Sequence, residues 1–138
     1  MPVINTKFLV HTNGNSDIVD LTYKIKLIIS EFDIKNALVS VHSPCSSTGI
    51  GVMEYNPDII RDFSDLISKF IPYDINYKHN AEWNDNLADT YLKSLFVGCS
   101  VSIPFVEGSF ELDRFQRILL FDFNSLSATR SVIIQIIY

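Results

Sequence analysis

Apolar and polar positions near the N-terminus change from a strand-like to a helix-like spacing. Residues 6–12 alternate as in a half-buried strand, and the Asn-Gly-Asn sequence at 13–15 is a strong turn signal. After this turn, apolar residues recur on one helical face, at Ile18, Leu21, Ile25, Ile28 and Ile29. Because Ser16 and Asp17 are good N-cap residues, the pattern predicts a helix that begins at one of them.

The middle of the chain combines two short strands with two further helices. Apolar segments at 37–42 and 49–53 predict strands on either side of a polar loop. A helix is predicted from an Asn-Pro start at 56–57 to a stop at Pro72, and another from residue 85 or 86 to about 97. The stretch at 73–84 is polar, irregular and rich in aromatic residues.

The last forty residues change back to strand patterns separated by short turns. The predicted strands span residues 101–106, 109–112, 115–123 and 129–138. About three helices followed by antiparallel strands predict an α+β fold, with residues 1–138 as a single domain. The near-continuous apolar content of 118–123 and 132–137 predicts that both faces of these strands are buried.

Composition narrows the classes of function. Hydrophobic residues make up 47% of the chain and charged residues 20%, which is typical of a globular protein. The net charge is −5 and no basic cluster occurs, so a nucleic-acid partner is not expected. No signal-peptide pattern or membrane-length apolar run is present, and the two cysteines form no disulfide framework. We therefore expect a cytoplasmic protein with no membrane partner.

Four segments, in order along the chain, carry a resemblance to a known family. Ala37–Ile50 contains Ser-Pro and Ser-Thr-Gly-Ile, and Glu54–Asp62 contains Asn-Pro-Asp and Arg-Asp. Tyr77–Gly98 contains Tyr-x-His and a helix ending in Gly, and Ile103–Phe123 contains Ile-Pro, a Glu-Gly turn and a Gln before an apolar strand. Together these segments resemble the YjbQ-type family, whose members show a weak thiamine-phosphate synthase activity. The resemblance covers essentially the whole chain.

The resemblance implies an α+β homotrimer with a polar, histidine-containing site that is suited to a metal. This chain departs from that pattern at most of the histidines. The loop histidine of the family falls on Cys45, and the His-x-His pair falls on Asp89 and Tyr91. The Gly-Thr-Trp-Gln motif falls on residues 113–116. His79, Gln116 and Glu54 keep the family's residue type.

Three of these positions offer metal-ligand chemistry, and two offer a nucleophile and a base. Cys45, His79 and Asp89 would supply a thiolate, an imidazole and a carboxylate to zinc or another divalent metal. Cys45 with His79 would instead be a nucleophile and a base, with Gln116 beside them. The spacing of the three ligands lacks a zinc signature, so no cofactor is expected on the residues alone. The plain alternatives are a small buried Cys45 and an Asp89 that pairs with Lys93 one helical turn later.

A second set of residues could contact an anionic ligand. Ser46, Ser47 and Thr48 form a hydroxyl-rich turn that could hold a phosphate with backbone N–H groups, although no Walker spacing is present. Arg114 and Gln116 are predicted to share one face of a strand, and the resemblance adds Glu54. The ligand expected at such residues is a phosphorylated small molecule. Ordinary turn chemistry and a solvated strand edge are the alternatives.

Two functions from different classes therefore stay open. The first is a homotrimeric binding or assembly protein whose histidine site has been lost. The second is an enzyme with thiamine-phosphate-synthase-like activity that uses His79 with Cys45, Asp89 and Gln116 on a phosphorylated small molecule. A variant of the first is a trimeric scaffold that binds another protein. The replacement of the histidines at Cys45 and Asp89 favours the first.

Overall fold

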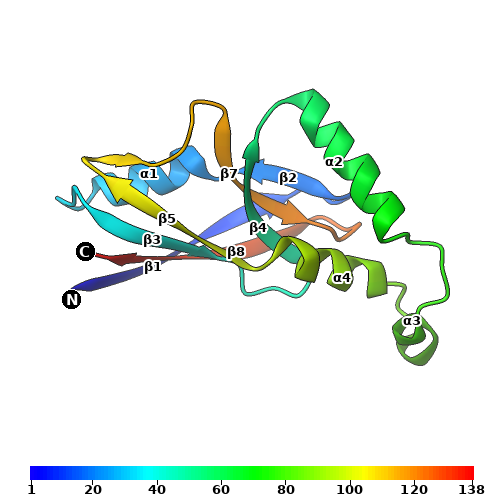
Figure 1. Cartoon of the computed structure of the whole chain (residues 1–138). Helices are drawn as coiled ribbons and strands as arrows, with labels where there is room; N and C mark the ends of the chain where they lie inside the picture. Colours follow the sequence, from blue (N-terminus) through cyan, green and yellow to red (C-terminus); the bar gives the residue numbers. More distant parts are fainter.

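Eight antiparallel strands in two sheets form most of the protein in the computed structural model, which describes residues 1–138 (Figure 1). The five-stranded sheet has the order β1 (Val3–Thr12), β8 (Ala128–Ile137), β3 (Ala37–His42), β5 (Ser100–Val106) and β6 (Ser109–Phe110). The three-stranded sheet has the order β2 (Asp17–Asp20), β7 (Gln116–Asp122) and β4 (Thr48–Glu54). Because β1 pairs with β8, the two chain ends lie side by side.

Four helices accompany the sheets, which confirms the predicted α+β class. They are α1 (Thr22–Ser30), α2 (Pro57–Phe70), α3 (Lys78–Trp83) and α4 (Ala88–Val97). The short α3 was not predicted, and Figure 1 shows it projecting from the body between α2 and α4. None of the four is both long and apolar enough to cross a bilayer.

The three-stranded sheet lies between two apolar cores. On one side, α1 and the inner face of the five-stranded sheet form the main core with the side chains of Ile50, Ile118 and Leu120. On the other side, Leu119 and Phe121 pack with Phe123 and with Ile67 of α2. Successive residues of β7 therefore point into different cores, as strand alternation requires.

Burial on both faces, predicted for two apolar strands, is confirmed for only one of them. Every residue from Ile118 to Asp122 is buried, because both faces of β7 are covered. Along β8 only alternate residues such as Val132 and Ile134 are buried, whereas Ile133 and Ile137 are partly exposed. Because β8 lies in the outer sheet, no element of the single chain covers its far face, and the predicted cover would have to come from a neighbouring subunit.

The predicted start of the first helix is also wrong. Residues 17–20 form β2 and pair with β7, although Ile18 and Leu21 have helical spacing. The helix begins only at Thr22, whose N–H donates to Asp20 at 2.9 Å. The hydroxyl of Thr22 accepts from the Ile118 N–H at 2.8 Å, which joins the start of α1 to β7. Tertiary pairing thus outweighs the local helical pattern.

The predicted start of α2 is confirmed by its cap. The side chain of Asn56 accepts from the N–H groups of Asp58 and Ile59, both at 3.0 Å, and Pro57 occupies the first turn. The next long helix, α4, begins at Ala88, a little later than predicted, because Asp85 accepts from the Leu87 N–H ahead of the helix.

Close packing of α4 on β4 depends on a glycine. A Cβ atom on Gly49 would lie 2.7 Å from Cγ1 of Val97 and 3.0 Å from the carbonyl oxygen of Gly98. The first distance is shorter than real Cβ contacts and the second is tighter than most of them, so glycine lets the end of this helix approach the strand without a shift of Val97. This approach fixes α4 over the loop that joins β3 to β4.

Candidate functional site

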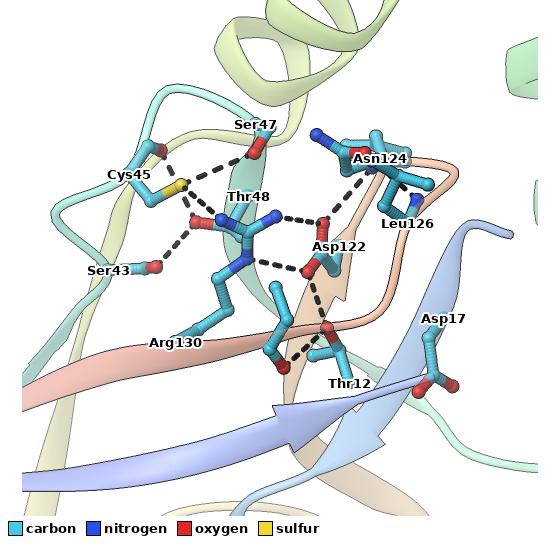
Figure 2. Close-up of polar contacts among 12 residues, drawn as sticks. Thr12, Asp17, Ser43, Cys45, Ser47, Thr48, Asp122, Asn124, Leu126 and Arg130 are labelled. Carbon is cyan, nitrogen blue, oxygen red and sulfur yellow. Dashed lines mark hydrogen bonds and ion pairs between the residues drawn. The ribbon is translucent and has the colours of Figure 1, made fainter. Parts of the chain in front are cut away.

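A buried carboxylate and a guanidinium form the centre of the candidate site (Figure 2). Asp122, at the end of β7, is fully buried and accepts from Nε of Arg130 at 2.7 Å and from its second terminal nitrogen at 3.3 Å. Thr12 donates to the same carboxylate at 2.7 Å and Asn124 donates its N–H at 3.1 Å. The hydrogen bond to Asp122 raises the pKa of Arg130, so the guanidinium stays charged.

The charged Arg130 holds the thiol of Cys45 on its other side. A terminal nitrogen of Arg130 lies 3.5 Å from Sγ of Cys45, and the hydroxyl of Ser47 lies 3.3 Å from the same sulfur. Burial by itself raises the pKa of Cys45, but the hydrogen bonds of Ser47 and the charge of Arg130 outweigh it and lower the pKa below the ordinary value. A lowered pKa favours the thiolate, which is the nucleophilic and metal-binding form.

Hydroxyl groups fix the loop that carries Cys45. Ser43 and Thr48 are buried and share a hydrogen bond of 2.5 Å, and Thr48 also donates to the carbonyl of Cys45 at 3.3 Å. Ser94 of α4 donates to the carbonyl of Thr48. The predicted phosphate turn is therefore largely satisfied internally, and Ser46 is its one hydroxyl residue that is exposed.

The residues predicted to bind an anion do not all lie together. Thr48 pairs with Asp122 at one end of the β4–β7 ladder, whereas Glu54 pairs with Gln116 at the other. Six residue steps at the rise of a β-strand separate these ends by about 20 Å. Within one chain, the Cys45 loop and the Arg114–Gln116 segment are thus two separate groups.

Arg114 and Gln116 come together for a reason other than the predicted one. Arg114 precedes β7 and lies in a loop, so the strand alternation that was expected to place it does not apply. Both residues nevertheless line one open cavity of about 430 Å³, together with Arg117 and with Lys26 of α1. Glu54 lies nearby on β4 and accepts from the side chain of Asn56 at 3.0 Å.

His79 and Asp89 belong to neither of these groups, and each has partners of its own. Asp89 is buried and pairs with Lys93 at 3.0 Å, so the predicted helical pair is present but lies inside the protein. The ring of His79 packs at 5.3 Å from that of Tyr91. Its Nδ1 is 3.2 Å from a carboxylate oxygen of Asp85, although the two atoms are not aligned as a hydrogen bond.

The predicted metal ligands do not fit a metal within this chain. Cys45, His79 and Asp89 do not converge, and no three His, Cys, Asp or Glu side chains are grouped as a metal site. Only Oδ2 of Asp89 is engaged by Lys93 and its buried Oδ1 has no partner, while the hydrogen-bond partners of Cys45 are Arg130 and Ser47. The predicted nucleophile–base contact between Cys45 and His79 is likewise not formed, because no hydrogen bond joins them.

Sequence reasoning identified Cys45 but missed the ion pair behind it. Asp122 stands in the apolar run Ile-Leu-Leu-Phe-Asp-Phe at 118–123. An acid inside a buried strand requires a partner, because an unpaired buried charge is costly, and this was the available signal. Nothing in the local sequence indicates that Arg130 is that partner, because the two residues meet through the packing of one sheet on the other.

Comparisons with known proteins agree over nearly the whole chain. A family model described as UPF0047 protein YjbQ-like matches residues 6–138. A UPF0047 protein of Archaeoglobus fulgidus is 31% identical over 119 residues, which cover 86% of this chain and 90% of the relative. A UPF0047 protein of Methanocaldococcus jannaschii is also 31% identical, over 86% of this chain and 83% of its own length.

Solved structures show the same fold. A YbjQ-like protein of unknown function from Sulfolobus solfataricus has a TM-score of 0.91 at 24% identity, and the match covers 98% of this chain and 96% of that one. A hypothetical protein from Aeropyrum pernix has a TM-score of 0.87 at 27% identity, over 95% of this chain and 96% of that one. With the family match over residues 6–138, these findings show that the chain belongs to the YjbQ-like UPF0047 family.

Proposed function

We propose that this chain is a homotrimeric binding protein in which fixed ion pairs and hydrogen bonds have replaced the family's histidine site. The observation that carries the proposal is the buried pair of Asp89 and Lys93, at 3.0 Å, where the resemblance places a histidine. The buried ammonium of Lys93 holds one carboxylate oxygen of Asp89, and breaking a buried ion pair to free that oxygen for a metal is costly. In this proposal, Asp89 stabilises the fold through its ion pair with Lys93, where the family has a site histidine.

An exposed apolar face supports the assembly part of the proposal. Leu66 and Phe70 of α2 are 68% and 65% exposed, and Leu95 and Phe96 of α4 are 79% and 60% exposed. Large exposed apolar patches are typical of interaction sites. We assign this face to a second copy of the chain, because it offers both parts of an apolar contact.

The two parts are a groove and a projecting side chain. The groove, about 170 Å³ in volume, is lined only by apolar residues, among them Phe63, Leu66 and Phe96. Leu95 of α4, which is exposed and precedes the groove residue Phe96, is the side chain that would fill the groove of a neighbouring copy. Repeating such a contact around an axis closes a ring, and a ring of three is what the family resemblance implies.

Light scattering of purified protein tests the assembly. The expected mass is three times the 15.7 kDa of one chain. Leu95→Glu should lower the mass by placing a charge in the contact. Leu126→Glu is the matched control, because Leu126 is 72% exposed but lies in the loop between β7 and β8. A monomeric wild type, or equal loss of mass in both variants, would contradict the assembly.

Metal analysis tests the loss of the histidine site separately. Wild-type protein purified without chelators should contain no stoichiometric zinc, and His79→Ala should not change the metal content. Zinc at one ion per chain that disappears in His79→Ala would refute this part of the proposal. It would favour the enzymatic alternative, in which His79 takes part in chemistry on a phosphorylated small molecule.

A further inference from the structure

We propose that the open cavity between α1 and the start of β7 binds a small phosphorylated organic molecule. The cavity measures about 430 Å³, within the range of small-molecule sites. It lies at the end of the β4–β7 ladder away from Cys45 and on none of the surface assigned above to assembly. The inference supplies a ligand class for the binding function just proposed.

The charges that line the cavity favour an anion. Lys26, Arg114 and Arg117 contribute three positive charges, against two negative charges from Asp20 and Asp113. The balance is therefore +1 in a chain whose net charge is −5. A positive cavity in an acidic protein concentrates anions, and guanidinium groups match phosphate oxygens in pairs.

Both carboxylates accept hydrogen bonds from the backbone, and neither forms an ion pair with Lys26 or Arg114. Asp113 accepts at one oxygen from the N–H groups of Phe115, at 2.8 Å, and Gln116, at 2.9 Å. Asp20 accepts from the Thr22 N–H at 2.9 Å, and its other oxygen lies 3.8 Å from Nε of Arg117. Hydrogen bonds of this kind spread the charge of each carboxylate over the backbone.

The side chains of Arg117, Gln116 and Arg114 have contacts that position them before a ligand arrives. One terminal nitrogen of Arg117 donates to the carbonyls of Arg114, at 3.0 Å, and Gln116, at 2.8 Å. Gln116 accepts from the Asp113 N–H through its side-chain oxygen, at 3.0 Å, which leaves its amide nitrogen free to donate. The guanidinium of Arg114 lies 4.7 Å from the centre of the Phe115 ring. Preorganised donors lower the entropy cost of binding.

The size and the apolar lining of the cavity indicate a ligand larger than phosphate itself. Phe110 and Leu112 form apolar wall, and Tyr23, whose side chain is 73% exposed, adds an aromatic ring. The apolar side chains of Phe110 and Leu112 and the ring face of Tyr23 gain little from an inorganic ion. An organic group attached to the phosphate would cover them and gain hydrophobic and stacking contacts.

Calorimetric titration with phenyl phosphate and inorganic phosphate tests the inference. Wild-type protein should bind phenyl phosphate about tenfold more tightly than inorganic phosphate, a difference that corresponds to about 1.4 kcal/mol. Replacing Lys26 and Arg114 by Gln should weaken phenyl phosphate at least about tenfold, because charge-assisted hydrogen bonds are lost. The side chains of Lys26 and Arg114 donate no hydrogen bond to the rest of the protein, so replacing them should not disturb the fold. Arg117 is left unchanged because its guanidinium holds two backbone carbonyls in place.

A matched double variant serves as the control. Arg61→Gln with Lys78→Gln removes the same charge from exposed positions on α2 and α3, and its affinity should equal that of the wild type. No binding of phenyl phosphate by the wild type would overturn the inference, as would equal weakening in both double variants. Equal affinity for the two probes would overturn the assignment of an organic ligand. Light scattering on the same samples reports assembly, so failure of one proposal is distinguishable from failure of the other.

Discussion

Replacing Asp122 by Asn should destabilise the protein more than any surface substitution. The side chain keeps its size but loses its charge. The carboxylate is fully buried and accepts from Thr12, from the Asn124 N–H and from two nitrogens of Arg130. An amide cannot replace these contacts, because its NH₂ group would face the guanidinium donors. The variant therefore leaves the mostly buried charge of Arg130 without a counter-charge.

The expected size follows from the behaviour of buried ion pairs. Breaking such a pair by removing one partner costs about 3–5 kcal/mol. With a typical urea dependence of about 2 kcal/mol per molar, a loss of about 4 kcal/mol lowers the urea midpoint by about 2 M. Since a domain of this kind has a total stability of about 5–15 kcal/mol, the variant should be close to its unfolding limit.

Urea unfolding followed by circular dichroism, at one protein concentration, measures this effect. Thr12→Val removes only one hydrogen bond to the same carboxylate and should cost about 1–2 kcal/mol. Asp62→Asn, at an exposed position of α2, should change stability by less than about 0.5 kcal/mol. A cost below about 1 kcal/mol for Asp122→Asn would refute the argument that the pair acts as a buried, charged unit.

Three further predictions concern the loop thiol and the packing of the helices. The reaction of Cys45 with iodoacetamide, followed by peptide mass spectrometry, should reach half of its maximal rate below pH 9.0, because the pKa of the thiol is lowered. Ser47→Ala should move that midpoint to higher pH, and a wild-type midpoint at or above pH 9.0 would contradict the prediction. Gly49→Ala should cost about 1–3 kcal/mol in urea unfolding, because the new methyl group meets Val97, and an unchanged midpoint would show that α4 can move away. Asn56→Ala should cost about 1 kcal/mol through loss of the α2 cap, and a neutral result would show that the cap contributes nothing.

The pH dependence of stability follows from two groups of the candidate site, the thiol of Cys45 and the guanidinium of Arg130. The folded pKa of Cys45 is lowered, so the stability contributed by its thiolate is present above the ordinary thiol value of 9.0 and is lost as the pH falls through the folded pKa. The folded pKa of Arg130 is raised by its hydrogen bond to Asp122, so its contribution is fully present below the ordinary pKa of an arginine and is lost only above it. Over the usual working range, only the Cys45 contribution changes.

Much of the fold could be predicted because the strands after residue 100 have clear patterns and clear turns. The cap at Asn56 could also be predicted, because its hydrogen-bond partners lie only two and three residues later in the sequence. The start of the first helix was not readable. Ile18 and Leu21 are spaced as on a helix, but residues 17–20 pair as a strand with the backbone of β7. Because β7 lies about one hundred residues later in the sequence, the local pattern does not indicate this pairing.

The candidate site could be predicted only in part, and for a similar reason. Cys45 was identified from a motif position, and the pair of Asp89 and Lys93 follows from helical spacing. The guanidinium of Arg130 reaches Cys45 across 85 positions of sequence. The residues predicted to contact an anion lie in two places, because the ladder of β4 and β7 keeps Thr48 and Gln116 at opposite ends, and the sequence alone did not show this separation.

That ladder acts as a spacer of fixed length, and its length limits what one chain can do alone. A metabolite the size of a sugar phosphate is far shorter than the gap between the thiol of Cys45 and the guanidinium of Arg114, so it can touch one of them but not both. Chemistry that uses both groups on one molecule would require the thiol of one subunit to face the cavity of another. Cooperation between the two ends would then depend on protein concentration, and a dilute, monomeric sample would lose it while keeping its fold.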